Sequence, residues 1–182
     1  MKNKLLSILM LASLVSAVSM AAPRHIANTN METSGHNIGL GITSFGGSNA
    51  IASPALSFNL EFGALHSLQA FTAITNSDPF EFSLGSIYRY TLFGTRNLGW
   101  HVGAGFNLGT AASAATLLGT STSFYMNLLL PVTGFQFNLG GALSNVKVSF
   151  DGGLVMHLTP SPFKMFLTPL SGLLGASIHY FF

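Results

Sequence analysis

Apolar side chains recur at every second position along most of this chain, and this alternation restricts the folds it can adopt. The last eleven residues, GLLGASIHYFF, show the pattern best, with apolar or aromatic side chains at alternate positions Leu174, Ala176, Ile178, Tyr180 and Phe182. Successive side chains of a β-strand point to opposite faces, so this period of two places one strand face in an apolar medium. The same alternation predicts strands near residues 36–45, 53–63, 66–75, 80–93, 99–110, 146–158 and 172–182.

The other face of these strands is small and polar rather than charged, mostly Gly, Ser, Asn and Thr. Charged residues make up only 7% of the chain, against about 25% in an ordinary soluble domain. The mean hydropathy is +0.50, yet beyond the N-terminal region no apolar run is long enough for a transmembrane helix. A soluble barrel would fill its second face with Lys and Glu. The sequence therefore predicts a transmembrane barrel, with apolar side chains toward lipid and small ones inside, closed so that no strand edge meets lipid.

The number of strands depends on residues 120–144, which form either one long strand or two short ones broken at Pro131–Gly134. One strand there gives eight in total and two give nine, and single-chain bacterial barrels have an even number. We therefore expect an all-β fold, a transmembrane antiparallel up-and-down β-barrel of eight strands over residues 35–182. Ten strands is the alternative, if Phe163–Leu170 also forms a strand.

The N-terminal region has the layout of a secretory signal peptide. Lys2 and Lys4 precede an apolar stretch, and the small residues Ser19 and Ala21 fit cleavage after residue 21. We expect residues 1–21 to be removed and residues 22–34 to form a loose polar segment. Five basic and five acidic residues would then remain, so the formal charge of the exported chain would be zero. This charge balance gives no support to nucleic-acid binding.

Charged and aromatic residues of the strands are the candidate site residues. Four charges that share the interior face are expected to form a lumen charge cluster: Glu61, Arg89, Lys147 and Asp151. An unpaired buried charge is unfavourable, so we expect Glu61 to lie within ion-pairing range of Arg89 or Lys147. Large aromatic side chains fall near one rim of the predicted barrel and are expected to form an aromatic girdle: Phe62, Tyr88, Tyr90, Trp100, Tyr180 and Phe182.

The sequence contains no recognisable arrangement of catalytic or metal-binding residues. The six histidines, at positions 25, 36, 66, 101, 157 and 179, form no close ligand pair, and the chain has no cysteine. We expect His101, His157 and His179 to point into the lumen as hydrogen-bonded filling. No nucleophile, base and orienting group occur in a recognisable arrangement. We therefore expect no catalytic residue, no metal site and no cofactor.

The C-terminal alternation ending in Phe182 resembles the strand signature of bacterial outer-membrane β-barrel proteins. With the signal-peptide layout and the repeated alternation, nearly the whole chain resembles the small, eight-stranded barrels of the Gram-negative cell envelope. The resemblance implies an outer-membrane location, contact with outer-membrane lipid, and escort by periplasmic chaperones. It also implies that the barrel-assembly machinery reads an assembly signal consisting of Leu174, Ala176, Ile178, Tyr180 and Phe182.

The resemblance specifies architecture and location but not activity. We expect a non-enzymatic integral outer-membrane protein with a structural or surface-interaction role. One alternative is a porin-like passive channel for small or apolar solutes, which liposome swelling would detect. Another is a membrane-embedded lipid A hydrolase or acyltransferase. The lipid A deacylases pair a His with a Ser two residues later, whereas His157 is followed by Thr159.

Overall fold

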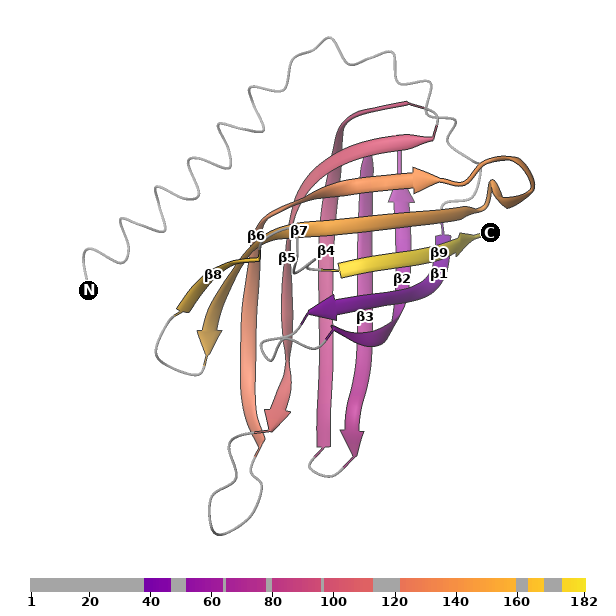
Figure 1. Cartoon of the computed structure of the whole chain (residues 1–182). Coiled ribbons are helices and arrows are strands. Elements are labelled where there is room, and N and C mark those ends of the chain that lie inside the picture. Colours follow the sequence, from indigo (N-terminus) through magenta and orange to yellow (C-terminus); the bar gives the residue numbers. More distant parts are fainter. Residues whose placement is uncertain are drawn as a thin grey trace.

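The computed structural model describes residues 38–46, 52–63, 65–77, 80–95, 97–112, 122–159, 164–168 and 175–182 (Figure 1). The expected signal peptide (residues 1–21) and loose segment (residues 22–34) lie outside these ranges. Among the described residues, no helix has the length and apolarity needed to cross a membrane. The described chain is almost entirely β-structure, with one short 3-10 helix, η1, at Gly141–Leu143.

The strands follow the predicted segments closely. Their bounds are β1 Ile38–Gly46, β2 Ala52–Phe62, β3 His66–Ser77, β4 Phe80–Gly94, β5 Leu98–Ala112, β6 Thr122–Asn138, β7 Val146–Thr159, β8 Lys164–Thr168 and β9 Gly175–Phe181. Consecutive strands from β1 to β7 pair in antiparallel fashion, and β9 pairs with both β7 and β1. The ring β1 to β7 plus β9 is a closed, eight-stranded, up-and-down antiparallel barrel, which confirms the predicted all-β class, strand number and topology.

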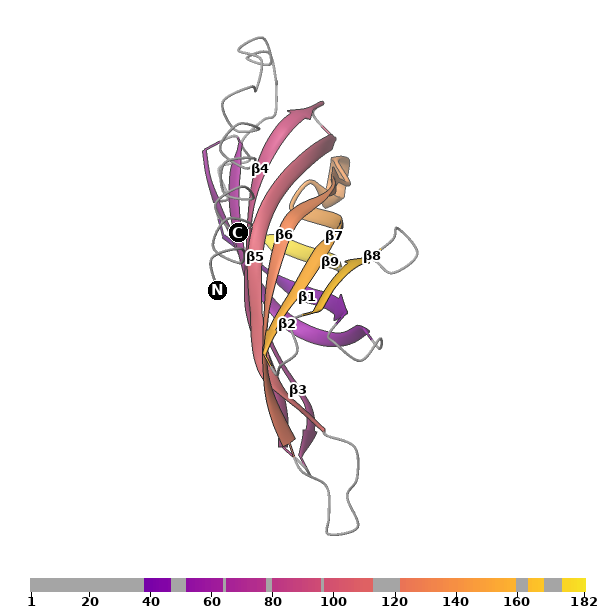
Figure 2. The ribbon, with the colours of Figure 1, turned by 90° about the vertical axis from the view of Figure 1, so that its left-hand side faces the viewer.

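Tilted strands wind around the barrel, so opposite walls cross in projection. Figure 1 shows β3, β4 and β5 running steeply across β1, β7 and β9, and Figure 2 shows the same curved wall from the side. The ring closes where β1 and β9 lie side by side, with Gly41 opposite His179. The backbone N–H of Phe182 donates to the carbonyl of Ile38 over 3.0 Å, which extends this seam by one more hydrogen bond.

A ninth, short strand, β8 at residues 164–168, lies in the region that the ten-stranded alternative required to be a strand. β7 pairs with β9 over Val146–Asp151 and with β8 over Gly153–His157. Strands β8 and β9 therefore occupy one position in the wall, one after the other along the same edge of β7. Within the described part of the chain, β8 pairs with no second strand, so it adds no member to the ring.

Residues 122–138 form a single strand in spite of Pro131. The pairing of β6 jumps from Leu129 to Val132 on the β7 side, and the same two residues face Gly105 and Gly103 on β5. Leu130 and Pro131 are thus left out of both ladders as a bulge. Proline lacks the N–H that a ladder needs, and strands tolerate it at bulges for that reason. The bulge also shifts the inward parity, from odd positions before it to even positions after it.

Candidate functional site

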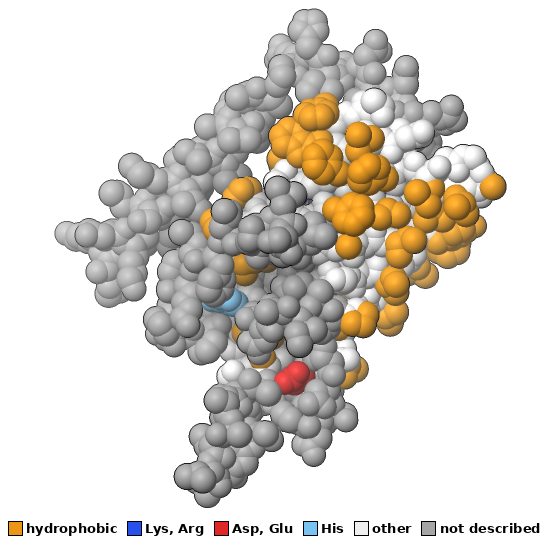
Figure 3. Space-filling view, in the orientation of Figure 1, with side chains coloured by type: hydrophobic (Ala, Val, Ile, Leu, Met, Phe, Trp, Pro, Cys, Tyr) orange, Lys and Arg blue, Asp and Glu red, His pale blue; other side chains and the backbone are white. Residues whose placement is uncertain are grey.

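The wall of the barrel is apolar outside and polar inside. Along β2, Leu56 and Phe58 are 70% and 40% exposed, whereas Ser57 and Asn59 are 5% and 3% exposed. Figure 3 shows apolar side chains covering much of the described surface in that view. Soluble proteins have the opposite distribution, with paired or solvated charges outside and apolar side chains inside. The candidate chemistry of this protein therefore lies in its interior.

An ion pair between Arg89 on β4 and Asp151 on β7 spans the interior. Nε and Nη2 of Arg89 lie 3.0 Å and 2.6 Å from Oδ1 and Oδ2 of Asp151, which is bidentate geometry. Nε2 of His101 on β5 lies 2.7 Å from the same Oδ1. None of the three residues is more than 2% exposed. Because a buried charge is tolerated only when it is paired, Arg89 and Asp151 depend on each other.

A chain of hydrogen bonds continues from Arg89 to the closing seam. Nη2 of Arg89 also donates to Oε1 of Gln69 on β3. This contact orients the Gln69 amide, whose Nε2 donates over 2.6 Å to Oγ of Ser57 on β2. Ser57 Oγ lies 2.8 Å from Nε2 of His179 on β9. A consistent assignment has the serine hydroxyl donate to His179. We call the six residues of this chain the central network: His101, Asp151, Arg89, Gln69, Ser57 and His179.

A second ion pair lies nearer the rim where Gly63 connects β2 to β3. Nζ of Lys147 is 2.7 Å and 2.5 Å from the two carboxylate oxygens of Glu61. Gln136 on β6 donates to Glu61 Oε1 over 3.3 Å. The ammonium group also lies 4.4 Å from the ring centroid of Phe181, within cation–π range. The side chains of Lys147 and Glu61 are 9% and 16% exposed, so this pair is less deeply buried than the Arg89–Asp151 pair.

The four expected lumen charges all point inward, but they form two pairs rather than one cluster. Strand alternation placed Glu61 within reach of Arg89 or Lys147, and the structure pairs it with Lys147. Arg89 pairs with Asp151 instead. Sequence reasoning identified His101 and His179 as lumen filling but did not foresee their partners. It missed Gln69 and Ser57 as members of the network, although both share the inward parity of their strands.

Large inward rings fill the lumen by lying opposite inward glycines of the neighbouring strand. The paired positions are Phe71 with Gly85, Tyr125 with Gly109, His101 with Gly134 and Phe181 with Gly39. A Cβ atom added at Gly85 would collide with the ring of Phe71, and one added at Gly39 would lie 2.9 Å from the ring of Phe181. The glycines therefore make room for rings rather than leaving empty space, which fits the narrow interior of an eight-stranded barrel.

The expected girdle residues lie on the outer surface near one rim. Phe62 and Tyr88 are 44% and 39% exposed, with ring centroids 6.3 Å apart. His66 joins them, stacked at 5.8 Å on Phe62 and hydrogen-bonded through Nδ1 to Tyr88 Oη at 2.6 Å. Tyr90 follows, with its ring centroid 5.1 Å from that of His66. The outer surface near this rim therefore carries a run of contacting aromatic rings.

Two further aromatic pairs extend this band. Trp100 has its ring centroid 4.8 Å from that of Phe93, which a bulge after Thr91 turns outward and which sequence reasoning did not include. Tyr180 and Phe182 are 50% and 59% exposed, with ring centroids 5.2 Å apart. Of the expected assembly signal, Ala176, Ile178, Tyr180 and Phe182 lie along one outward face, and Leu174 lies outside the described residues.

The contact between Ser57 and His179 has the spacing of a nucleophile and its base. Both side chains are buried, however, and Ser57 Oγ already accepts a hydrogen bond from Gln69. A serine held in this way is suited to a structural role, because a lipid substrate would have to reach an atom inside the packed network. Within the described ranges, no group of three or more His, Asp or Glu side chains is arranged to hold a metal ion.

Comparison of the chain with protein-family models, curated proteins and solved structures found no match. The class defined by the fold is thus a closed, eight-stranded antiparallel β-barrel with a polar, ion-paired interior.

Proposed function

We propose that this protein is an integral outer-membrane β-barrel with a structural or surface-interaction role, non-enzymatic, and with a lumen closed to ions. The observation that carries the proposal is the inverted polarity of the wall. Ile42, Leu56 and Ile74 are 56%, 70% and 71% exposed on the outside, while Arg89 and Asp151 are buried inside. Removing one large apolar side chain from water is worth about 1.5–3 kcal/mol. If all the outward apolar side chains stayed in water, the stabilisation that their burial could provide would be lost. Summed over the wall, this free energy is larger than the net stability of an ordinary domain, about 5–15 kcal/mol.

Three further features support the membrane location. The described strands β1 to β7 and β9 pair into a closed ring, and closure is what a β-structure needs in lipid. The aromatic rings gather near one rim, as in membrane barrels whose aromatic girdles lie at the interface. The sequence also begins with the layout of a signal peptide, and its last strand carries the alternation typical of outer-membrane barrels.

The packed interior favours a structural role over a channel. The central network crosses the lumen, the Glu61–Lys147 pair lies nearer one rim with the ring of Phe181 beside it, and Phe71 is buried as a further inward ring. Opening a water path would require separating buried ion pairs, which is strongly unfavourable. Among the described residues, no arrangement combines an accessible nucleophile with a base.

Trp100 allows a direct test of the membrane location because it is the sole tryptophan of the chain and lies in the outer aromatic band. In phosphatidylcholine vesicles, we expect lipids brominated near the head group to quench its fluorescence more strongly than lipids brominated near the chain end. A soluble barrel mixed with the same vesicles would show no dependence on bromine depth. Equal quenching by bromines at every depth, or no quenching, would contradict insertion in the proposed orientation.

A closed lumen also predicts that the same vesicle-inserted protein does not conduct ions. In planar bilayers, the wild-type protein should produce no reproducible single-channel steps, because two buried ion pairs and the inward rings obstruct the interior. Quenching of Trp100 serves as the control that the protein is inserted. Regular steps from an inserted sample would refute the closed lumen and would favour the channel alternative instead.

A further inference from the structure

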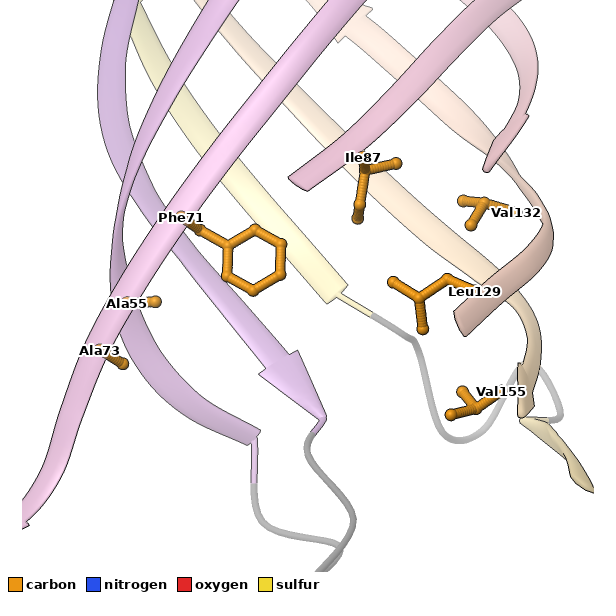
Figure 4. Close-up of a cluster of buried hydrophobic side chains, with 7 residues drawn as sticks. All are labelled: Ala55, Phe71, Ala73, Ile87, Leu129, Val132 and Val155. Atoms are coloured by element: carbon orange, nitrogen blue, oxygen red, sulfur yellow. The ribbon is translucent and has the colours of Figure 1, made fainter. Parts of the chain in front are cut away.

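The interior side chains pack against one another, so contacts with other molecules fall to the outer surface of the barrel. Figure 4 shows seven apolar side chains directed inward from opposite walls, and each of them is no more than 8% exposed. The ion pairs and hydrogen bonds of the central network occupy the polar part of the lumen. On the outer surface, His66 is distinctive because three aromatic neighbours hold its ring in place.

His66 lies at the start of β3 and is the central residue of an outward group of rings. Across the strands it is paired with Phe62 on β2 and with Tyr90 on β4. Its ring is stacked on that of Phe62 with an interplanar angle of 8° and a centroid distance of 5.8 Å. The ring centroids of Tyr90 and Tyr88 lie 5.1 Å and 6.0 Å from that of His66. We call Phe62, His66, Tyr88 and Tyr90 the rim cluster.

The hydrogen bond to Tyr88 determines which nitrogen of His66 is offered to another molecule. Nδ1 of His66 lies 2.6 Å from Oη of Tyr88, at the exposed surface. We assign the phenol as the donor, because an imidazole nitrogen is a better acceptor than a phenolic oxygen. The neutral ring then carries its hydrogen on Nε2, and the protonated ring carries one there as well. Nε2 is therefore an N–H donor in both charge states.

The surroundings of this donor favour an anionic acceptor. The rings of Phe62 and Tyr90 lie against the imidazole and favour positive charge on it. Glu61 is close in sequence but points inward, where it pairs with Lys147. Hydrogen bonds with an ionised partner are shorter and about twice as strong as those between neutral groups. A phosphate oxygen is therefore a better match for Nε2 of His66 than a neutral carbonyl.

The rim cluster also lies where phosphates occur in a bilayer. Phe62 and Tyr88 are partly exposed on the outer face and belong to the aromatic band. In membrane barrels such bands lie at the interface, at the level of the lipid head groups. The next outward pair away from this rim, Leu60 and Leu68, is apolar. The acyl chains of a phospholipid can thus lie along the apolar wall while its phosphate reaches His66.

We propose that the rim cluster binds the phosphate of one phospholipid head group, which accepts a hydrogen bond from Nε2 of His66. Tyr88 is the positioning residue, since its hydroxyl holds Nδ1 and leaves Nε2 for the phosphate. Phe62 and Tyr90 hold the ring from its sides. The lipid source of the phosphate rests on the proposed membrane location, and the experiment below separates the two.

Solid-state nuclear magnetic resonance tests this contact directly. The probe is the phosphorus of phosphatidylcholine, and the full-length protein carries isotope-labelled histidine nitrogens in bilayers of that lipid, in phosphate-free buffer. Recoupling to phosphorus should attenuate the Nε2 signal of His66, which is assigned by its absence from the His66→Phe variant. The signals of His101 and His179 should keep their intensity, because both side chains are buried in the lumen.

Replacing Tyr88 with phenylalanine should reduce the attenuation about twofold or more, because the ring loses the hydrogen bond that directs Nε2 outward. Tyr180→Phe is the matched control, since it removes a phenolic hydroxyl from the same aromatic band but outside the rim cluster. It should leave the attenuation unchanged. Depth-dependent quenching of Trp100 shows that each variant is folded and inserted.

The other outcomes separate the site from the membrane location. Normal quenching of Trp100 without attenuation of the His66 signal would overturn the phosphate site and leave the membrane location standing. Equal attenuation in Tyr88→Phe and the wild type would overturn the role of Tyr88. Attenuation in digalactosyldiacylglycerol bilayers with added inorganic phosphate, as strong as in phosphatidylcholine, would identify free phosphate as the ligand and overturn the lipid. Loss of depth-dependent quenching in the wild type would contradict the membrane location itself.

Discussion

Replacing Asp151 with alanine is expected to destabilise the folded barrel by about 3–5 kcal/mol, which is the usual cost of leaving one partner of a buried ion pair uncompensated. Asp151 accepts two hydrogen bonds from Arg89 and contacts His101 over 2.7 Å. Its removal leaves the buried guanidinium of Arg89, which is 2% exposed, with the hydrogen bond to Gln69 but without a counter-charge. Urea unfolding in vesicles, followed by Trp100 fluorescence, measures the loss.

The rim pair supplies the matched control for this substitution. Glu61→Ala also removes the carboxylate partner of a basic side chain, but the Lys147–Glu61 pair is less deeply buried, with side chains 9% and 16% exposed. We expect a smaller loss of stability than for Asp151→Ala, about 1–3 kcal/mol, between the values for exposed and for buried pairs. The double variant Arg89→Leu with Asp151→Leu should recover much of the loss, because replacing both partners by apolar groups is often near neutral. Equal effects of Asp151→Ala and Glu61→Ala would contradict the assigned importance of the central pair.

Substituting alanine for Gly41 is expected to destabilise the closed barrel. Gly41 lies opposite His179 at the β1–β9 seam, where the last and first strands of the ring meet. A Cβ atom there would collide with the backbone carbonyl of Ile178 and lie 2.8 Å from the Cα of His179. Backbone atoms of a paired strand cannot move aside as a flexible side chain can, so the cost should reach about 3 kcal/mol, the upper end for overpacking.

The difference in migration between unboiled and boiled samples on a gel measures closure, because a closed barrel resists detergent. Gly152→Ala is the control: it makes the same chemical change in β7, where an added Cβ has nothing nearer than the carbonyl of Thr133 at 4.0 Å. When samples are heated in steps before loading, we expect Gly152→Ala to lose the folded band at the same temperature as the wild type and Gly41→Ala to lose it at a clearly lower temperature. Equal transition temperatures for Gly41→Ala and the wild type would contradict the close contact at the seam.

Alternation was enough to predict the fold and the direction of most side chains. A strand has two faces, so the parity of a residue within its strand decides whether it points in or out, and no knowledge of other strands is required. This local rule placed Glu61, Arg89, Lys147 and Asp151 inside and Tyr180 and Phe182 outside before any strand was paired. The rule assigns side chains to the wrong face beyond a bulge, because the bulge shifts the parity, as at Leu130–Pro131 and near Phe93.

The tertiary structure alone decided which inward side chains meet. Arg89 is on β4 and Asp151 on β7, so their contact depends on strand tilt and on the register accumulated over three strand pairs. The same holds for the path from Gln69 through Ser57 to His179, which joins β3 to β9 across the closing seam. Parity is a property of single residues along one strand, whereas contact across the lumen is a property of the closed ring. For that reason the sequence determined which charges face the interior, and only the closed barrel determined that they form two separate pairs.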